Sequence, residues 1–134
     1  MSSTPLTGKK IAVIVEAQYI PGEIKIYRER FASYGATVDF VSRLWGHPSQ
    51  RFYSTIEPGV VDQLEWLDVS KDFDSVSPED YAAVIVAANY TSVRLRWSER
   101  ADVSADNAAE VARNVPAARF FRRAMENPRI IKML

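Results

Sequence analysis

The sequence has no cysteine, one histidine and five glycines among its 134 residues. Without cysteine, these residues can form no disulfide, no thiolate zinc site and no cysteine nucleophile. The single histidine, His47, excludes a metal centre built from several histidines. The few glycines form neither a G-x-G-x-x-G nor a P-loop pattern, so a backbone cradle for phosphate is not expected. The sequence therefore predicts no metal and no cofactor.

An excess of charge of one sign is also absent, because 17 lysines and arginines balance 17 aspartates and glutamates. A neutral chain has no overall field that attracts nucleic acid or an anionic membrane. Residues 81–88 form the longest apolar run, far short of the ~20 residues that span a bilayer. The first seven residues lack the basic and apolar blocks of a signal peptide. We therefore expect no nucleic-acid or membrane partner, and a cytoplasmic location.

What remains has the composition of a globular domain, with 47% hydrophobic and 25% charged residues. We interpret residues 1–8 as a flexible leader and residues 9–134 as a single α/β domain. Continuous apolar runs indicate strands that are buried on both faces of a parallel sheet. These strands are predicted at 10–16, 37–42, 81–88 and 129–134, with a less regular hairpin from 51–55 and 65–69.

Two helices are predicted between these strands, at 22–34 and 116–126. In the first, Tyr27, Phe31 and Tyr34 recur at helical spacing. In the second, Pro116 suits the first helical turn. The alternation of strands and helices predicts a doubly wound, mostly parallel sheet in a flavodoxin-like three-layer sandwich.

The polar segment 89–113 has no clear helical or strand period, and it contains Arg94, Arg96 and Arg100 beside Trp97. Such a cluster either recognises an anion or forms a solvated or interface surface, and its role stays open. The last predicted strand has no turn and helix after it, although active sites of open α/β sheets lie at the carboxyl ends of the strands. Either the sequence is incomplete, or a small four-stranded domain ends on a strand.

Two acidic residues stand near the carboxyl end of the first strand. Glu23 opens the first helix, where a carboxylate is also favoured by the helix dipole alone. Glu16 ends the strand and suggests a phosphate- or metal-dependent acidic site. A receiver domain, however, needs an aspartate after another parallel strand. The third strand ends in Ala87-Ala88 and is followed by Asn89, so that aspartate is missing here.

The order of these segments resembles the N-terminal two-thirds of the ThiJ/PfpI family, within the class I glutamine amidotransferase-like superfamily. The resemblance covers residues 9–134 and is weakest over 44–70. Its motifs are Lys10-Ile-Ala-Val-Ile-Val15, Pro21-Gly-Glu-Ile24, Asp80-Tyr-Ala-Ala-Val-Ile-Val86 and the helix and strand of 116–134. The third motif is similar to the family's D-Y-D-A-L-V-I strand, and the fourth is similar to the segment that leads into the nucleophile elbow.

The resemblance implies three site features. The family's nucleophilic cysteine would directly follow Leu134, so the sequence would stop just before it. Glu23 matches the family's glutamate, which donates a hydrogen bond to the thiolate or shuttles a proton. The backbone N–H of Asn89 would serve an oxyanion hole. Where the family has Pro-Gly-Gly, this chain has Ala87-Ala88-Asn89, and a non-glycine residue there narrows the permitted backbone.

The function that the resemblance implies is that of a cysteine-dependent hydrolase or lyase. Its substrate would be a small electrophile, an amide or a peptide-like molecule, and the protein would be a homodimer. The alternative, from another class, is a non-catalytic binding, regulatory or chaperone-like module on the same fold. The replacement of Gly-Gly by Ala88-Asn89 favours this second interpretation.

Overall fold

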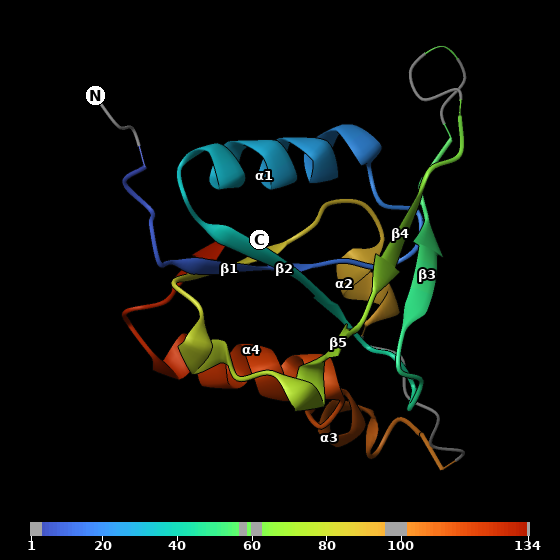
Figure 1. Ribbon diagram of the computed structural model, residues 1–134. Helices are drawn as coiled ribbons and strands as arrows, with labels where there is room; N and C mark the ends of the chain where they lie inside the picture. Colours follow the sequence, from blue (N-terminus) through green and yellow to red (C-terminus); the bar gives the residue numbers. More distant parts are fainter. Residues whose placement is uncertain (1–3, 57–58, 60–62, 96–101, 134) are drawn as a thin grey trace.

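A five-stranded parallel sheet forms the centre of the molecule (Figure 1), for which the computed structural model describes residues 4–56, 59, 63–95 and 102–133. The strand order is β5-β2-β1-β6-β7, and each neighbouring pair is parallel. In that order the strands are Lys71–Asp72, Thr37–Ser42, Lys10–Ile14, Ala83–Val86 and Ile131–Met133. The predicted parallel sheet is therefore confirmed.

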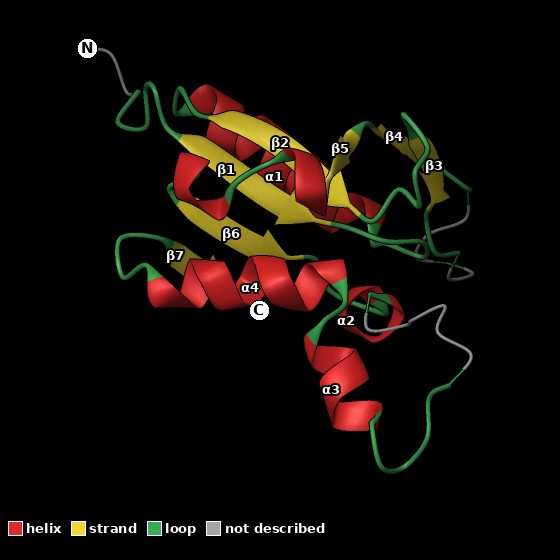
Figure 2. Ribbon diagram, turned by 90° about the horizontal axis from the view of Figure 1, so that it is seen from below, coloured by secondary structure: helices red, strands yellow, loops and turns green. Residues whose placement is uncertain are grey.

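Helices cover both faces of this sheet. α1 (Pro21–Ser33) lies over one face and α4 (Pro116–Glu126) over the other (Figure 1). α3 (Ala108–Arg113) precedes α4 and lies near its N-terminal end (Figure 2), and α2 (Thr91–Arg94) follows β6. The doubly wound, three-layer, flavodoxin-like architecture predicted from the sequence is confirmed.

The side chains of β1 alternate between two hydrophobic cores, one on each face. Ile11 and Val13 join the core beneath α1, while Ala12 and Ile14 join the core beneath α4. All four are at most 4% exposed. Burial on both faces explains why the strand is a continuous apolar run rather than an alternating one.

A glycine at the end of α1 allows the N-terminal segment to pass close by. Gly35 has φ of 91°, and a Cβ atom there would lie 2.7 Å from Thr7 Oγ1. The backbone N–H of Leu6 donates to Tyr34 O at 2.9 Å, and the Leu6 side chain packs against the core on the α1 face. The division into a leader of 1–8 and a domain of 9–134 stays a prediction.

The hairpin between the second and third main strands is confirmed. β3 (Gln50–Tyr53) pairs antiparallel with β4 (Trp66–Val69), outside the main sheet. Phe52 and Leu67 are buried in the core on the α1 face, while Tyr53 and Trp66 point outward and are 47% and 58% exposed. This alternation follows from the two-residue period of a strand.

Several predicted bounds were too long, and some short elements were not predicted. The strands expected at 10–16 and 81–88 end at Ile14 and Val86. Of the strand expected at 129–134, the structure shows Ile131–Met133, and residue 134 lies outside the described part. β5 (two residues), α2 (four) and α3 (six) were missed because they are too short to show a clear period. Two 3-10 turns, Phe73–Ser75 and Pro78–Asp80, lead from β5 to β6.

One polar cluster is buried within the sheet beside the core on the α4 face. Tyr81 Oη donates to Asp39 Oδ2 at 2.9 Å, and Lys10 Nζ lies 3.6 Å from the same oxygen. Burial, together with the hydrogen bond and charge of Asp39, raises the pKa of Tyr81 well above its ordinary value. The phenol therefore stays neutral and supplies a donor to a buried carboxylate.

We expect Tyr81→Phe to lower the free energy of unfolding by about 2 kcal/mol, because a buried charged acceptor loses its hydrogen-bond donor. Urea denaturation at neutral pH measures this change. The matched control is Tyr34→Phe, since Tyr34 is exposed at the end of α1. An equal effect of the two substitutions would contradict the role of the cluster.

The hydrogen bond of Tyr81 makes the free energy of unfolding depend on pH. Because the pKa of Tyr81 in the folded state lies above the ordinary 10.0, this bond stabilises the fold fully below pH 10, and the stabilisation is lost as the pH rises above that value. The stability of Tyr81→Phe should therefore fall less steeply with alkaline pH than that of the wild type.

Candidate functional site

The candidate site lies where the direction of winding changes. From β1 the chain passes to β2 on one side, and β6 later pairs with the other side of β1. The loops that follow β1 and β6 diverge at the carboxyl ends of these two strands. Such a switch point is where open α/β sheets bind their ligands.

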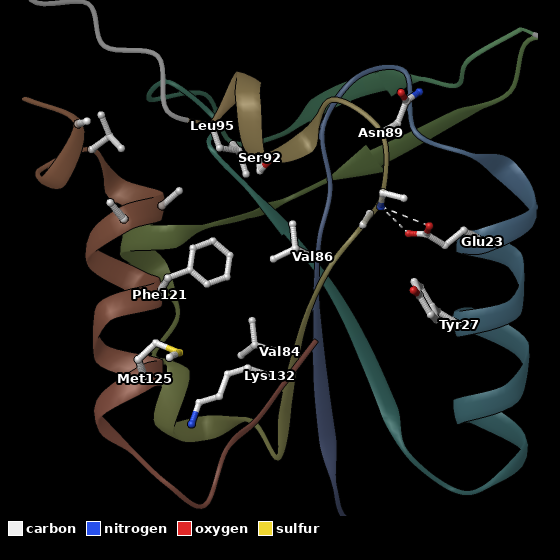
Figure 3. A pocket seen from close by; sticks show the side chains of 16 residues that line it. Glu23, Tyr27, Val84, Val86, Asn89, Ser92, Leu95, Phe121, Met125 and Lys132 are labelled. Atoms are coloured by element: carbon white, nitrogen blue, oxygen red, sulfur yellow. Dashed lines mark hydrogen bonds between the residues drawn. The ribbon is translucent and has the colours of Figure 1, made fainter. Parts of the chain in front are cut away.

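Glu23 connects the two elements that meet at this point. It lies in the first turn of α1 and is half-buried. Its Oε1 and Oε2 accept the backbone N–H of Ala88 at 2.9 and 3.3 Å (Figure 3). The structure thus places the Glu23 carboxylate at the carboxyl end of β6. The sequence predicted a position near the carboxyl end of the first strand, which is at the same edge of the sheet. The amide that the carboxylate contacts belongs to Ala88, one residue before Asn89.

Asn89 adopts the left-handed backbone that the resemblance assigns to glycine. Its φ is 79°, and asparagine is among the few side chains that tolerate this region. The Asn89 side-chain amide donates to Gln18 O at 2.7 Å, and Gln18 itself has φ of 64°. The turn therefore forms with asparagine, whose side chain adds a bond to the loop after β1.

Gln18 joins three segments and was not found from the sequence. Its backbone N–H donates to Tyr53 O at 2.7 Å in the hairpin, and its Oε1 accepts from Arg94 Nη2 at 3.0 Å. Together with the bond from Asn89, these contacts hold the β1–α1 loop, the β6–α2 loop and the hairpin together. A polar residue in a loop gives no sequence signal for such a role.

Glu16, considered as an acidic site residue, lies beside this loop. Its Oε1 accepts the backbone N–H of Ala17 at 2.7 Å. Burial raises the pKa of Glu16, while the Ala17 N–H and the positive charge of Arg94 oppose the rise. Within the described ranges, no group of three or more potential metal ligands is found. The Glu16 carboxylate is therefore bonded to the backbone of its own loop, and among the described residues it belongs to no group that could hold a metal ion.

The remaining candidates divide between the described and the undescribed residues. Arg94 reaches Gln18, as given above. Arg96, Arg100 and Trp97 lie outside the described residues. His47 is exposed in the loop between β2 and β3. In the part of the chain that the structure describes, no helix has the length and apolarity to cross a bilayer.

A cavity of about 860 Å³ opens beside Glu23. Its lining comes from both faces of the sheet: Figure 3 shows Glu23 and Tyr27 of α1 on one side of β6 and Phe121 and Met125 of α4 on the other. Its floor carries Val84 and Val86 of β6 and Lys132 of β7. The walls are mostly apolar, and the volume is within the range of small-molecule sites.

No protein-family model and no curated protein matches this sequence. Among solved structures, the fold is similar to a two-domain protein from Anabaena variabilis that contains DJ-1/ThiJ/PfpI-like and ferritin-like domains, with a TM-score of 0.62, 15% identity and 88% of this chain covered. The chain has a DJ-1/ThiJ/PfpI-like fold. The fold implied by the sequence resemblance is thereby confirmed.

Two further structures with lower TM-scores are a DJ-1 superfamily protein from Agrobacterium tumefaciens and a ThiJ/PfpI domain protein from Brachyspira murdochii. Their TM-scores are 0.43 and 0.47, their identities 12% and 16%, and they cover 86% and 66% of this chain. The chain spans 27% of the Anabaena protein and 50% and 45% of the other two. At these identities, the likeness shows the fold and leaves the activity to be proposed.

The backbone at Asn89 gives a testable prediction. Asn89→Gly and Asn89→Ala both lose the bond to Gln18, but alanine is also strained at positive φ. We expect the alanine variant to be less stable than the glycine variant by about 1 kcal/mol in urea denaturation.

Glu29 provides the control, because it is an exposed residue inside α1. There the order should reverse, with the glycine variant less stable than the alanine variant. Equal or greater stability of Asn89→Ala than of Asn89→Gly would contradict the left-handed turn.

Proposed function

We propose that this chain supplies the glutamate and the oxyanion amides of a ThiJ/PfpI-type cysteine-dependent active site, with the nucleophile directly after Leu134. The reaction is hydrolase or lyase chemistry on a small electrophile, an amide or a peptide-like substrate. The observation that carries the proposal is the contact of the Glu23 carboxylate with the Ala88 N–H at the switch point, at 2.9 Å.

The strand register supports this position for the nucleophile. β7 pairs in parallel with β6, and Met133 lies opposite Ile85. Continued by two residues, the same register brings the position after Leu134 level with Ala87. Neighbouring strands are ~4.8 Å apart, so a side chain at that position would be adjacent to the Ala88 N–H and to Glu23.

The alternation of side chains supports it as well. Ile85 and Ala87 face the core beneath α1. The position after Leu134 has the same parity as Ile131 and Met133, which pair with Ala83 and Ile85. Its side chain would therefore point to the α1 face, which is the face that carries Glu23.

This arrangement suits attack by a thiolate on a carbonyl or similar carbon. A cysteine at a strand–turn–helix elbow has its thiolate stabilised by the helix N-terminus. A protonated Glu23 carboxyl can donate to the sulfur while its other oxygen keeps the Ala88 N–H. Because the Ala88 N–H stays with Glu23, the backbone N–H of Asn89, in its left-handed turn, is the donor proposed for the oxyanion.

The alternative is a non-catalytic binding or regulatory module. It is favoured by Ala88-Asn89, which stand where the resembled family has Gly-Gly. The residue that follows Leu134 in the natural polypeptide distinguishes the two functions. Intact-mass measurement and sequencing of the purified protein identify it, and a cysteine there supports the enzyme.

Substitution of Glu23 tests the proposed role in the protein that carries the nucleophile. Glu23→Gln keeps a hydrogen-bond donor but cannot transfer a proton, whereas Glu23→Leu does neither. We expect turnover to fall with both, and by about 100-fold or more with leucine.

The control is Glu29→Gln, an exposed carboxylate on the same helix, which should leave turnover unchanged. Unchanged turnover of Glu23→Leu would reject the catalytic role of Glu23.

We further propose that the protein is a cytoplasmic homodimer, as the family resemblance implies. The outward face of the hairpin offers a surface for a second copy, because Tyr53 and Trp66 are directly opposite each other and exposed. Sedimentation at micromolar concentration should give a dimer, and Trp66→Glu should shift it towards monomer. A monomeric wild type would contradict the dimer, and recovery of the protein in a membrane fraction would contradict the cytoplasmic location.

A further inference from the structure

Two non-glycine residues with a left-handed backbone meet at the switch point. Gln18 has φ of 64° and Asn89 has φ of 79°, and the side-chain amide of Asn89 donates to Gln18 O at 2.7 Å. Asparagine tolerates this backbone better than most side chains, whereas glutamine has no such advantage. Strained residues of this kind persist only where their surroundings hold them, and they cluster at functional sites. The contacts of Gln18 must therefore account for its strained backbone.

Gln18 is held from three directions. Its N–H donates to Tyr53 O at 2.7 Å, its carbonyl accepts the bond from Asn89, and its Oε1 accepts from Arg94 Nη2 at 3.0 Å. The next residue, Tyr19, is buried in the core on the α1 face. The hairpin and the core thus fix the position of the Gln18 carbonyl independently of the turn that it contacts.

Asn89 has much less support of its own. It is exposed, and its side-chain amide has Gln18 O as its acceptor. Its backbone N–H has no acceptor among the described residues. This N–H is the donor proposed for the oxyanion, and it is available to bind one. The direction of the N–H depends on the turn, which the bond to Gln18 O holds against the loop after β1.

From these contacts we infer that Gln18 is a positioning residue of the proposed active site. Its main-chain carbonyl anchors the Asn89 side chain, and the anchored turn keeps the Asn89 N–H aimed at the developing oxyanion. Gln18 acts through Asn89 and not on the substrate itself. The inference rests on the proposed function, because it concerns the oxyanion donor of that reaction.

The direction of this donor matters for one reaction of a thiolate and not for another. When a thiolate attacks the carbonyl carbon of an ester, the carbonyl oxygen becomes negative and is stabilised by a donor. When iodoacetamide alkylates the same thiolate, the sulfur bonds to the methylene carbon as iodide leaves, and no oxyanion forms. A loosened turn should therefore slow the first reaction and leave the second unchanged.

The experiment compares these two reactions in the polypeptide that continues past Leu134. The first probe is p-nitrophenyl acetate, from which the thiolate takes the acetyl group while p-nitrophenolate leaves and is measured by its absorbance. We expect Asn89→Gly, which keeps the turn but loses the bond to Gln18, to slow this acylation about tenfold. The rate of alkylation by iodoacetamide, the second probe, should not change.

Gln18→Val tests the anchor itself, because a β-branched residue rarely adopts the left-handed backbone. It should slow acylation as much as Asn89→Gly does, whereas Gln18→Gly permits the same backbone and should retain most of the wild-type rate. In the double variant of Gln18→Val and Asn89→Gly the two losses should not add, because both remove one bond. The control is Trp45→Val, which places the same strain at φ of 56° in the loop after β2 and should leave acylation unchanged.

Unchanged acylation in Asn89→Gly overturns the inference, and so do losses that add in the double variant. Equal slowing of acylation and alkylation also overturns it, because the substitution then acts on the thiolate rather than on the oxyanion. If Gln18→Val does not fold, Asn89→Gly alone decides.

The inference and the proposed function fail in different ways. If Glu23→Leu slows turnover while Asn89→Gly does not slow acylation, the positioning role is wrong and the proposed enzyme stands. If no cysteine follows Leu134, the proposed function is rejected, and the role of Gln18 is rejected with it.

Discussion

The hydrogen bond between the Glu23 carboxylate and the Ala88 N–H is the contact on which the site depends. It ties the first turn of α1 to the end of β6, two elements whose contacting residues are 65 positions apart in the chain. Because β1 lies between β2 and β6, this bond closes the switch point of the sheet. The carboxylate satisfies the hydrogen-bonding capacity of the Ala88 amide, and the bond holds the side chain of Glu23 at the end of β6.

Polar contacts join the loops on either side of this bond. Gln18 and Asn89 both have left-handed backbones, and the bond between them fixes one loop against the other. Asparagine tolerates this backbone, so the turn after β6 forms without a glycine.

The sequence predicted what depends on local patterns. The buried run of Ile11–Val15 reads as a strand because both of its faces are covered, and Pro116 marks the start of α4 as expected. α2 and α3 were not predicted because four and six residues are too few to show a clear period. The contacts of Gln18 with Tyr53 and Asn89 join residues far apart in the chain, and no local signal encodes them. The position of Glu23 was predictable from its place after β1, but its partner amide was not.

The central claim is that Glu23 faces the nucleophile position across the Ala88 amide. The most direct test is the rate of iodoacetamide alkylation as a function of pH, in the polypeptide that continues past Leu134, with the modified residue located by mass spectrometry. The account predicts alkylation of a cysteine directly after Leu134. It also predicts that Glu23→Leu moves the thiol titration to higher pH, since the thiolate loses a hydrogen-bond donor. The absence of a cysteine at that position, or an identical titration in Glu23→Leu, would contradict it.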